Sequence, residues 1–90
     1  MKIIEELNIE VDNDIYKGNC KFINLDSYPD NIDEYELKTV KVEIKGNEID
    51  CFIATGTVED AYGMQYEQIN LYLLKDIEES LLDEEVTFKF

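Results

Sequence analysis

The residues that decide the fold run from Thr39 to Ala54 and read TVKVEIKGNEIDCFIA. Between Thr39 and Lys45, valine and isoleucine alternate strictly with charged residues, a pattern typical of a strand with one buried face. The dipeptide Gly46-Asn47 is typical of a tight turn, and the alternation resumes after it, from Glu48 to Ala54. The stretch therefore predicts an antiparallel hairpin.

A two-residue loop at Gly46-Asn47 defines how the two strands of this hairpin pair. In that register every apolar residue of one strand meets an apolar residue of the other, and opposite charges meet beside the loop. The expected pairs are Lys45 with Glu48, Ile44 with Ile49, Val42 with Cys51 and Val40 with Ile53. A slip of one residue would bring Asp50 to the face of the valines, so the pattern specifies the register strongly.

Further alternating segments extend the sheet on both sides of the hairpin. A third strand is expected from Gln65 to Leu74, which completes an antiparallel meander. Strands are also expected from Leu7 to Val11, near Ile15 to Leu25, and from Val86 to Phe90. Residues 2–6 fit one helical turn as well as a strand, and both interpretations stay open there.

The segment from Asp76 to Leu82 has the pattern of a short helix. Ile77 and Leu81 form an i,i+4 apolar stripe, and Asp76 and Glu79 have the spacing of a capping box. The sequence thus predicts an α+β protein with a single domain over residues 1–90. We expect a small antiparallel β-meander or partly open barrel of about five strands, with one short C-terminal helix.

Composition narrows the function classes. The chain has 22 acidic residues against 8 lysines, no arginine and no histidine, and its formal net charge is −14. Such a chain should be repelled by phosphate, so direct binding to nucleic acid is not expected. Without histidine, imidazole-based catalysis is excluded, and no other catalytic motif is found, so we expect no enzymatic activity. No apolar run approaches the ~20 residues that span a bilayer, and the N-terminus lacks the profile of a signal peptide, which favours a cytoplasmic protein without membrane contact.

Metal and cofactor sites are not expected either. Asp12 and Asp14 fit the first positions of a calcium loop, but Tyr16 and Lys17 stand where a ligand and glycine are needed. Cys20 and Cys51 lack the spacing and the companion ligands of a zinc site, and two cysteines are few for a disulfide scaffold. We expect two reduced, partly buried thiols.

Three groups of acidic residues are candidates for contact with a partner, beside the shorter run of Glu10, Asp12 and Asp14. The loop from Asp26 to Glu36 holds five acids and no lysine, Glu48 and Asp50 share the polar face of the hairpin, and a third group surrounds the expected helix. Tyrosines in such loops are favoured at protein interfaces. The candidate partner-binding residues are Asp26, Tyr28, Asp30, Asp33, Glu34, Tyr35, Glu36, Glu48, Asp50, Asp76, Glu78, Glu79, Asp83, Glu84 and Glu85.

In its size, its charge and the acidic stretches Asp26–Glu36 and Asp76–Glu85, the chain resembles the small acidic DNA-mimic proteins of bacteriophages and mobile elements. This group includes anti-CRISPR proteins, anti-restriction proteins, a uracil-glycosylase inhibitor and inhibitors of histone-like nucleoid proteins, and it shares neither a motif nor one fold. The resemblance implies a mechanism in which carboxylates occupy a Lys/Arg surface that would otherwise hold phosphate, and so block the target without chemistry.

We therefore expect a non-enzymatic inhibitor whose partner is a basic nucleic-acid-binding protein. An immunity protein that neutralises a nuclease toxin would use the same physics. The alternative from another class is a structural or assembly protein that self-associates through a sheet edge, and a homodimer stays open. Binding that weakens with salt and is competed by DNA would favour mimicry over assembly.

Overall fold

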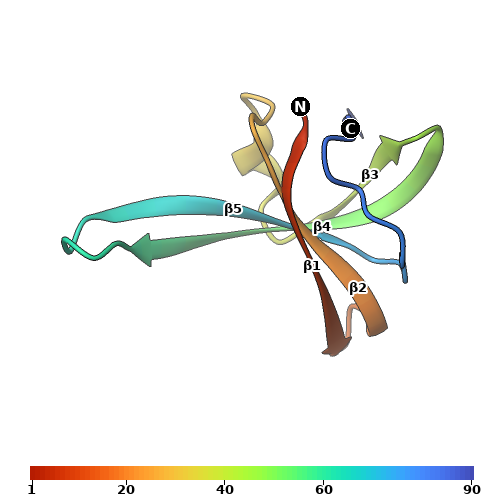
Figure 1. Cartoon of the computed structure of the whole chain (residues 1–90), viewed down its shortest axis with the longest axis horizontal. Helices are drawn as coiled ribbons and strands as arrows, with labels where there is room; N and C mark the ends of the chain where they lie inside the picture. The colour runs from red at the N-terminus through yellow and green to blue at the C-terminus, as the bar shows by residue number, and fades with distance from the viewer.

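Six antiparallel strands form one sheet, in the order β1-β2-β5-β4-β3-β6 (Figure 1). The strands are β1 (Ile3–Asp12), β2 (Lys17–Leu25), β3 (Thr39–Ile44), β4 (Asn47–Glu59), β5 (Gln65–Leu73) and β6 (Thr87–Lys89), and one 3-10 turn, η1 (Ile32–Tyr35), precedes β3. The structure, a computed structural model, describes the backbone of residues 1–90 and the side chains of all of them except Thr57 and Val58.

The expected α+β class with a C-terminal helix is wrong, because the sheet is open and the protein is essentially all-β. Along the described backbone, η1 is the only helical turn, and the segment Asp76–Leu82 is irregular. Backbone groups of this segment bond to side chains of the sheet: Leu81 N donates to Glu6 Oε2 at 2.7 Å, and the Glu79 carbonyl accepts from Lys21 Nζ at 2.5 Å. A helix of two turns is marginal in water, so these tertiary bonds prevail.

Most of the expected strands are present. The strand predicted from Gln65 to Leu74 is confirmed as β5, and the strand predicted from Val86 to Phe90 is confirmed as β6. β1 begins at Ile3, so the residues that the sequence left open are almost all strand. The sheet has six strands instead of about five, because each of the six alternating segments of the sequence forms a strand of its own.

The hairpin of β3 and β4 is confirmed, but its predicted register is wrong by two residues. The two turn residues are Lys45 and Gly46, with φ angles of 55° and 79°, which is the geometry of a tight hairpin turn with both central residues left-handed. Ile44 consequently pairs with Asn47, Val42 with Ile49 and Val40 with Cys51. A shift of two residues leaves each side chain on its original face, so the buried face is the predicted one.

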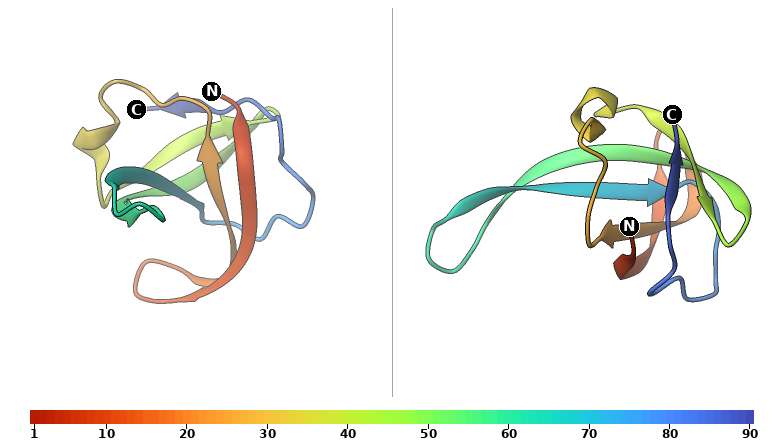
Figure 2. Two further views of the ribbon diagram at one scale, coloured as in Figure 1. Left: turned by 60° about the vertical axis from the view of Figure 1, so that its left-hand side comes forward. Right: turned by 90° about the horizontal axis from the view of Figure 1, so that it is seen from above.

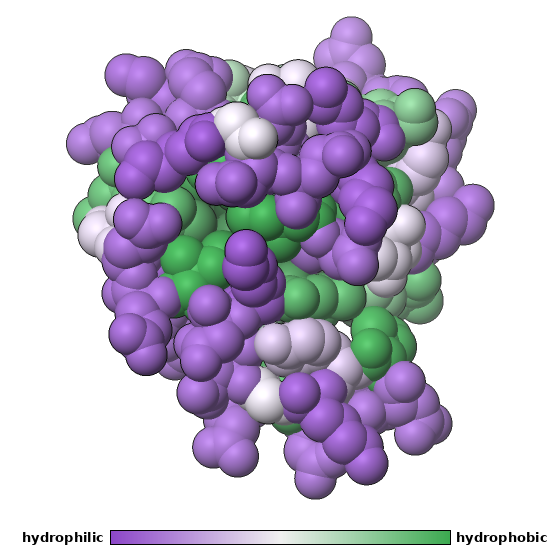
Figure 3. Space-filling view, turned by 90° about the vertical axis from the view of Figure 1, so that its right-hand side faces the viewer, coloured by the Kyte–Doolittle hydropathy of each residue, from purple (hydrophilic) through white to green (hydrophobic). Residues whose placement is uncertain are grey.

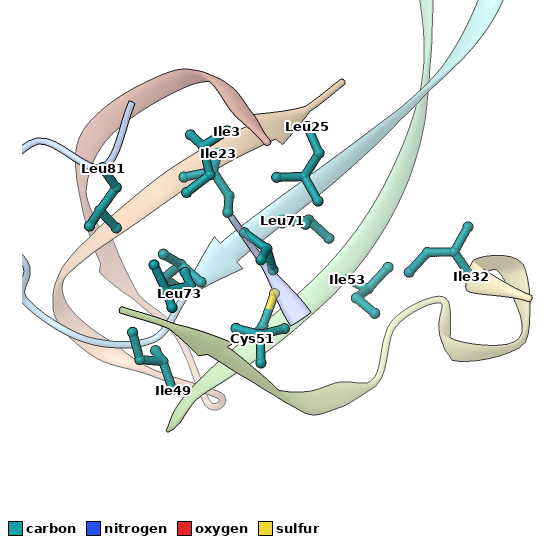
Figure 4. Close-up of a cluster of buried hydrophobic side chains, with 13 residues drawn as sticks. Ile3, Ile23, Leu25, Ile32, Ile49, Cys51, Ile53, Leu71, Leu73 and Leu81 are labelled. Atoms are coloured by element: carbon teal, nitrogen blue, oxygen red, sulfur yellow. The ribbon is translucent and has the colours of Figure 1, made fainter. Parts of the chain in front are cut away.

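The core lies on one face of the bent sheet, which we call the inner face. Because paired residues share a face, the register places the alternating aliphatic residues of β2 to β5 together, and their sticks converge in Figure 4. Segments outside the strands complete this cluster, since Ile32 of η1 and Leu81 of the irregular segment are also buried. Fully burying an aliphatic side chain of this size contributes roughly 1.5–3 kcal/mol to stability.

The hairpin of β4 and β5 projects beyond the rest of the sheet, to the left in Figure 1 and in the right-hand view of Figure 2. β3 pairs with β4 only as far as Phe52, and β2 pairs with β5 only as far as Leu71. We call the projecting part, residues 55–69, the arm. Its tip exposes Tyr62 and Met64. Among the residues that the structure describes, no helix has the length and apolar character needed to cross a lipid bilayer.

Candidate functional site

Two acidic stretches that lie far apart in the sequence meet at the start of β1. On one side of the Lys2 backbone, Asp26 N donates to the Lys2 carbonyl at 2.9 Å and Asp26 Oδ1 accepts from Lys2 N at 2.8 Å. On the other side, Lys2 forms an isolated β-bridge with Glu85. The backbone of Asp83 and Glu84 pairs with Ile3 through hydrogen bonds of 2.9 and 3.0 Å. One strand end therefore carries carboxylates from both stretches.

The loop from Asp26 to Glu36 is held to the body by its apolar residues. Ile32 is buried in the core, and the ring of Tyr35 stacks on Phe90 with the ring centroids 4.0 Å apart. Tyr28 Oη donates to the Ile69 carbonyl at 3.2 Å and accepts from Leu25 N at 2.9 Å. Both tyrosines that the sequence proposed as partner contacts thus anchor the loop.

The acids of the same loop point to solvent. Asp30, Asp33 and Glu34 are exposed, and within the described side chains none of them has an ammonium group in ion-pair contact. Glu36 is also exposed, but its carboxylate accepts a hydrogen bond from the hydroxyl of Thr55 at the base of the arm. A backbone hydrogen bond from Lys2 holds the pKa of Asp26 below its ordinary value. We call Asp26, Asp30, Asp33, Glu34, Asp83 and Glu84 the acidic end.

The hairpin acids stand among cations. Asp50 Oδ1 lies 2.6 Å from Lys41 Nζ, and this hydrogen bond raises the pKa of Lys41. Glu48 pairs directly with Glu43 across the hairpin, and Glu43 in turn lies 3.2 Å from Lys89. Lysines therefore alternate with carboxylates on this face, which is not the one-signed surface that a basic partner would favour.

The third predicted group, around the segment from Asp76 to Glu85, is divided between paired and unpaired acids. Glu79 lies 3.5 Å from Lys45, and Glu85 lies 2.9 Å from the N-terminal ammonium group. Asp76 and Glu78 line a hollow of about 430 Å³ together with Glu10. Figure 3 views the side opposite the arm, where this segment lies, and shows hydrophilic side chains over most of it. In the part of the chain that the structure describes, no three potential ligands are grouped to hold a metal ion.

Sequence reasoning missed the buried ion pair of Glu6 and Lys21. Lys21 is only 2% exposed, its Nζ lies 3.1 Å from Glu6 Oε2, and Glu6 Oε1 accepts from the Ser80 hydroxyl at 2.6 Å. Desolvation raises the pKa of Glu6, but the hydrogen bonds from Ser80, Leu81 and Lys21 outweigh it and lower this pKa overall. The alternation of β2 could have indicated that Lys21 is buried, because Lys21 shares its strand face with the apolar residues Ile23 and Leu25.

Both thiols are free, as predicted, and both are buried. Burial raises the pKa of Cys51 to about 12 and also raises the pKa of Cys20. At neutral pH both are therefore protonated and poor nucleophiles.

Comparisons of the chain with protein-family models, with curated proteins and with solved structures found no match. The surfaces of the molecule and their chemistry are therefore the basis on which its function is inferred.

Proposed function

We propose that the chain is a non-enzymatic inhibitor that mimics nucleic acid, and that its acidic end occupies the basic site of a DNA- or RNA-binding protein in the bacterial cytoplasm. Carboxylates would stand where the partner otherwise holds phosphates, and the block needs no chemical step. Phage counter-defence of the anti-CRISPR or anti-restriction kind, inhibition of a nucleoid protein, and neutralisation of a nuclease toxin are roles that this mechanism serves.

The observation that carries the proposal is the joining of two acidic stretches at one end of the molecule. Asp26 of the loop and Glu85 of the segment before β6 lie on opposite sides of Lys2. The loop acids Asp30, Asp33 and Glu34 are exposed and have no cation in contact among the described side chains. With a formal net charge of −14, the chain would attract a basic groove over a long range, with fast and salt-sensitive association.

The geometry also ranks the candidate residues. Asp50, Glu79 and Glu85 are neutralised by intramolecular cations, so we assign them a smaller share in partner binding. Tyr28 and Tyr35 act as anchors of the loop. The proposal therefore concentrates on the loop acids, which can be changed without removing a hydrogen bond that holds the fold.

The test compares two triple variants that change the net charge equally. Asp30→Asn/Asp33→Asn/Glu34→Gln neutralises the three loop acids of the acidic end whose carboxylates have no hydrogen-bonding role in the described fold, whereas Glu10→Gln/Asp12→Asn/Asp14→Asn neutralises three exposed acids at the β1–β2 turn. Each immobilised protein is exposed to a bacterial lysate at low salt, and the retained proteins are eluted with duplex DNA, with RNA or with salt. We expect the wild type and the turn variant to retain basic nucleic-acid-binding proteins that DNA or RNA releases, and the loop variant to lose them by at least about tenfold in affinity.

Equal retention by both triple variants would show that net charge alone acts, and would remove the acidic end as the site. Retention that neither polynucleotide nor salt reverses would contradict mimicry altogether.

A further inference from the structure

On the face of the sheet opposite the core, the described residues between Glu5 of β1 and Asp50 of β4 carry no charge. Register places Leu7 of β1 beside Phe22 of β2, Phe22 beside Tyr72 of β5, and Tyr72 beside Phe52 of β4. The neighbouring positions on this face, Ala54 with Asn70 and Gly56 with Gln68, are likewise uncharged. We call this surface, between Glu5 on β1 and the Lys41–Asp50 pair on β3 and β4, the uncharged face. Among the residues that the structure describes it holds no acid, although one residue in three of the chain is charged.

The centre of the uncharged face is aromatic. The ring of Tyr72 lies 5.4 Å from that of Phe22 in an edge-to-face arrangement and 6.5 Å from that of Phe52. Phe52 and Tyr72 also line an apolar hollow of about 300 Å³, whose wall includes Val11, Ile15, Ala54 and Leu74. Leu7 and Ile15 are 59% and 53% exposed. An aromatic centre with amide side chains at its margin is the composition of a protein interface.

We infer that the uncharged face is the contact surface of a symmetrical homodimer. A basic partner would bind where carboxylates are exposed, and the described residues of this face include no carboxylate. An acidic partner can approach this face, because no carboxylate on it repels the partner locally. A second copy of this chain meets that condition by symmetry, since a two-fold axis near Tyr72 would place the same uncharged residues opposite one another.

The size of the face is near the lower limit for this role. Four strands about 4.8 Å apart, with up to eight residues at about 3.3 Å each, cover roughly 500 Å² in projection. Because β2 pairs with β5 over only three residues, this area is an upper bound, and two such faces in contact bury at most the roughly 1,000 Å² that a specific interface needs. The acidic end stays free in such a dimer, because its residues lie outside the uncharged face.

The test is the mass of the chain in solution, measured by sedimentation equilibrium over a range of protein concentration. We expect a dimer that tightens as sodium chloride rises from about 0.05 M to about 0.5 M, because salt screens the repulsion between two polyanions. Binding of a basic partner through the acidic end would weaken over the same range, so failure of one proposal is distinguishable from failure of the other.

Leu7→Glu places two like charges across the interface on an exposed side chain, and should raise the dimer dissociation constant at least about tenfold. Leu82→Glu is the matched control: it makes the same change at an exposed leucine of the segment before β6 and should leave the dimer intact. Tyr72→Glu tests the centre of the face, with circular dichroism to establish folding. If this central variant does not fold, Leu7→Glu alone decides the question.

A wild-type chain that stays monomeric at high concentration and high salt would overturn the inference. So would a dimer that Leu7→Glu leaves unchanged. A monomer that binds a hydrophobic fluorescent dye, with the binding lost in Leu7→Glu, would assign the face to another apolar occupant and would equally overturn the homodimer.

Discussion

Lys21 is almost completely removed from solvent, and two oxygens hold its ammonium group, Glu6 Oε2 at 3.1 Å and the Glu79 carbonyl at 2.5 Å. Desolvating a charge is costly unless a well-placed counter-charge and hydrogen bonds offset the loss of water. Glu6 supplies the counter-charge, and its second oxygen receives the hydroxyl of Ser80. These few residues fix the segment before β6 to the sheet.

Replacing Glu6 should therefore destabilise the fold strongly. Glu6→Gln leaves the Lys21 charge buried without its partner, and we expect the free energy of unfolding to fall by about 3 kcal/mol. Urea unfolding followed by circular dichroism measures this change. Glu5→Gln removes the same charge from the exposed neighbouring residue and should change stability by less than about 0.5 kcal/mol. Similar losses in both variants would contradict a specific role for the ion pair.

The same residue should give part of the stability a pH dependence of known sign. The folded-state pKa of Glu6 is lowered from 4.5, so its contribution is fully present above that value and is lost as the pH falls through the folded-state pKa. The difference in unfolding free energy between wild type and Glu6→Gln should thus be constant near neutrality and shrink under acid conditions. Urea titrations at a series of pH values measure it, and a difference that grew on acidification would reverse the assignment.

At the scale of the element, the β3–β4 hairpin shows how turn conformation defines register. Alternation identified both strands and their buried face, but it could not distinguish two registers that differ by two residues, since both keep the same side chains inside. Gly46 takes the second left-handed position of the turn, and Lys45 is forced into the first. The alternation of apolar and charged residues did not indicate that Lys45 adopts a positive φ, and this conformation moves the turn by one residue.

This turn yields a pair of substitutions with opposite effects. Lys45→Asn should stabilise the hairpin by roughly 0.5 kcal/mol, because asparagine adopts a positive φ more readily than lysine and the pair of Lys45 with Glu79 is exposed. Gly46→Ala should cost about 1 kcal/mol, and the cost should be conformational, since a Cβ there would have no atom within 4 Å. Thermal unfolding of both variants tests the turn, and a stabilising Gly46→Ala would be incompatible with its φ of 79°.

The predicted helix failed for a reason of the same kind. The i,i+4 stripe of Ile77 and Leu81 describes what the segment would do alone. In the folded chain Leu81 N bonds to the Glu6 carboxylate, which lies 75 residues away in sequence. The spacing of residues within the segment carries no information about a hydrogen-bond partner so far away in the sequence. In the fold, the Glu6 carboxylate of β1 is the acceptor for Leu81 N, in place of a carbonyl of a short helix.

For the molecule as a whole, the dominant quantity is unbalanced negative charge. Ion pairs involve Glu6, Asp12, Glu43, Asp50, Glu79 and Glu85, and the remaining acids of the described side chains have no cation in contact. Mutual repulsion of these acids opposes the compact state. Like charges also stand directly opposite each other in the hairpin, where Glu43 pairs with Glu48 and only Glu43 has a lysine beside it.

Screening should relieve this repulsion. We expect the melting temperature to rise as sodium chloride is added at low protein concentration, where association is negligible. Differential scanning fluorimetry measures the rise, and a melting temperature independent of salt would show that the acids are already neutralised within the fold.

By itself the sequence determined the strands, the buried face of the hairpin and the excess of carboxylates. Alternation depends only on residues that are neighbours in the sequence, and the net charge depends only on how many residues of each type the chain contains. Only the tertiary structure decided that Asp26 and Glu85 flank Lys2, that Lys21 is buried against Glu6, and that the residues beside Tyr72 form an uncharged face. Each of these depends on strand order and register across the whole sheet. Pairings between distant segments are chosen by the total of their contacts, which no local stretch encodes.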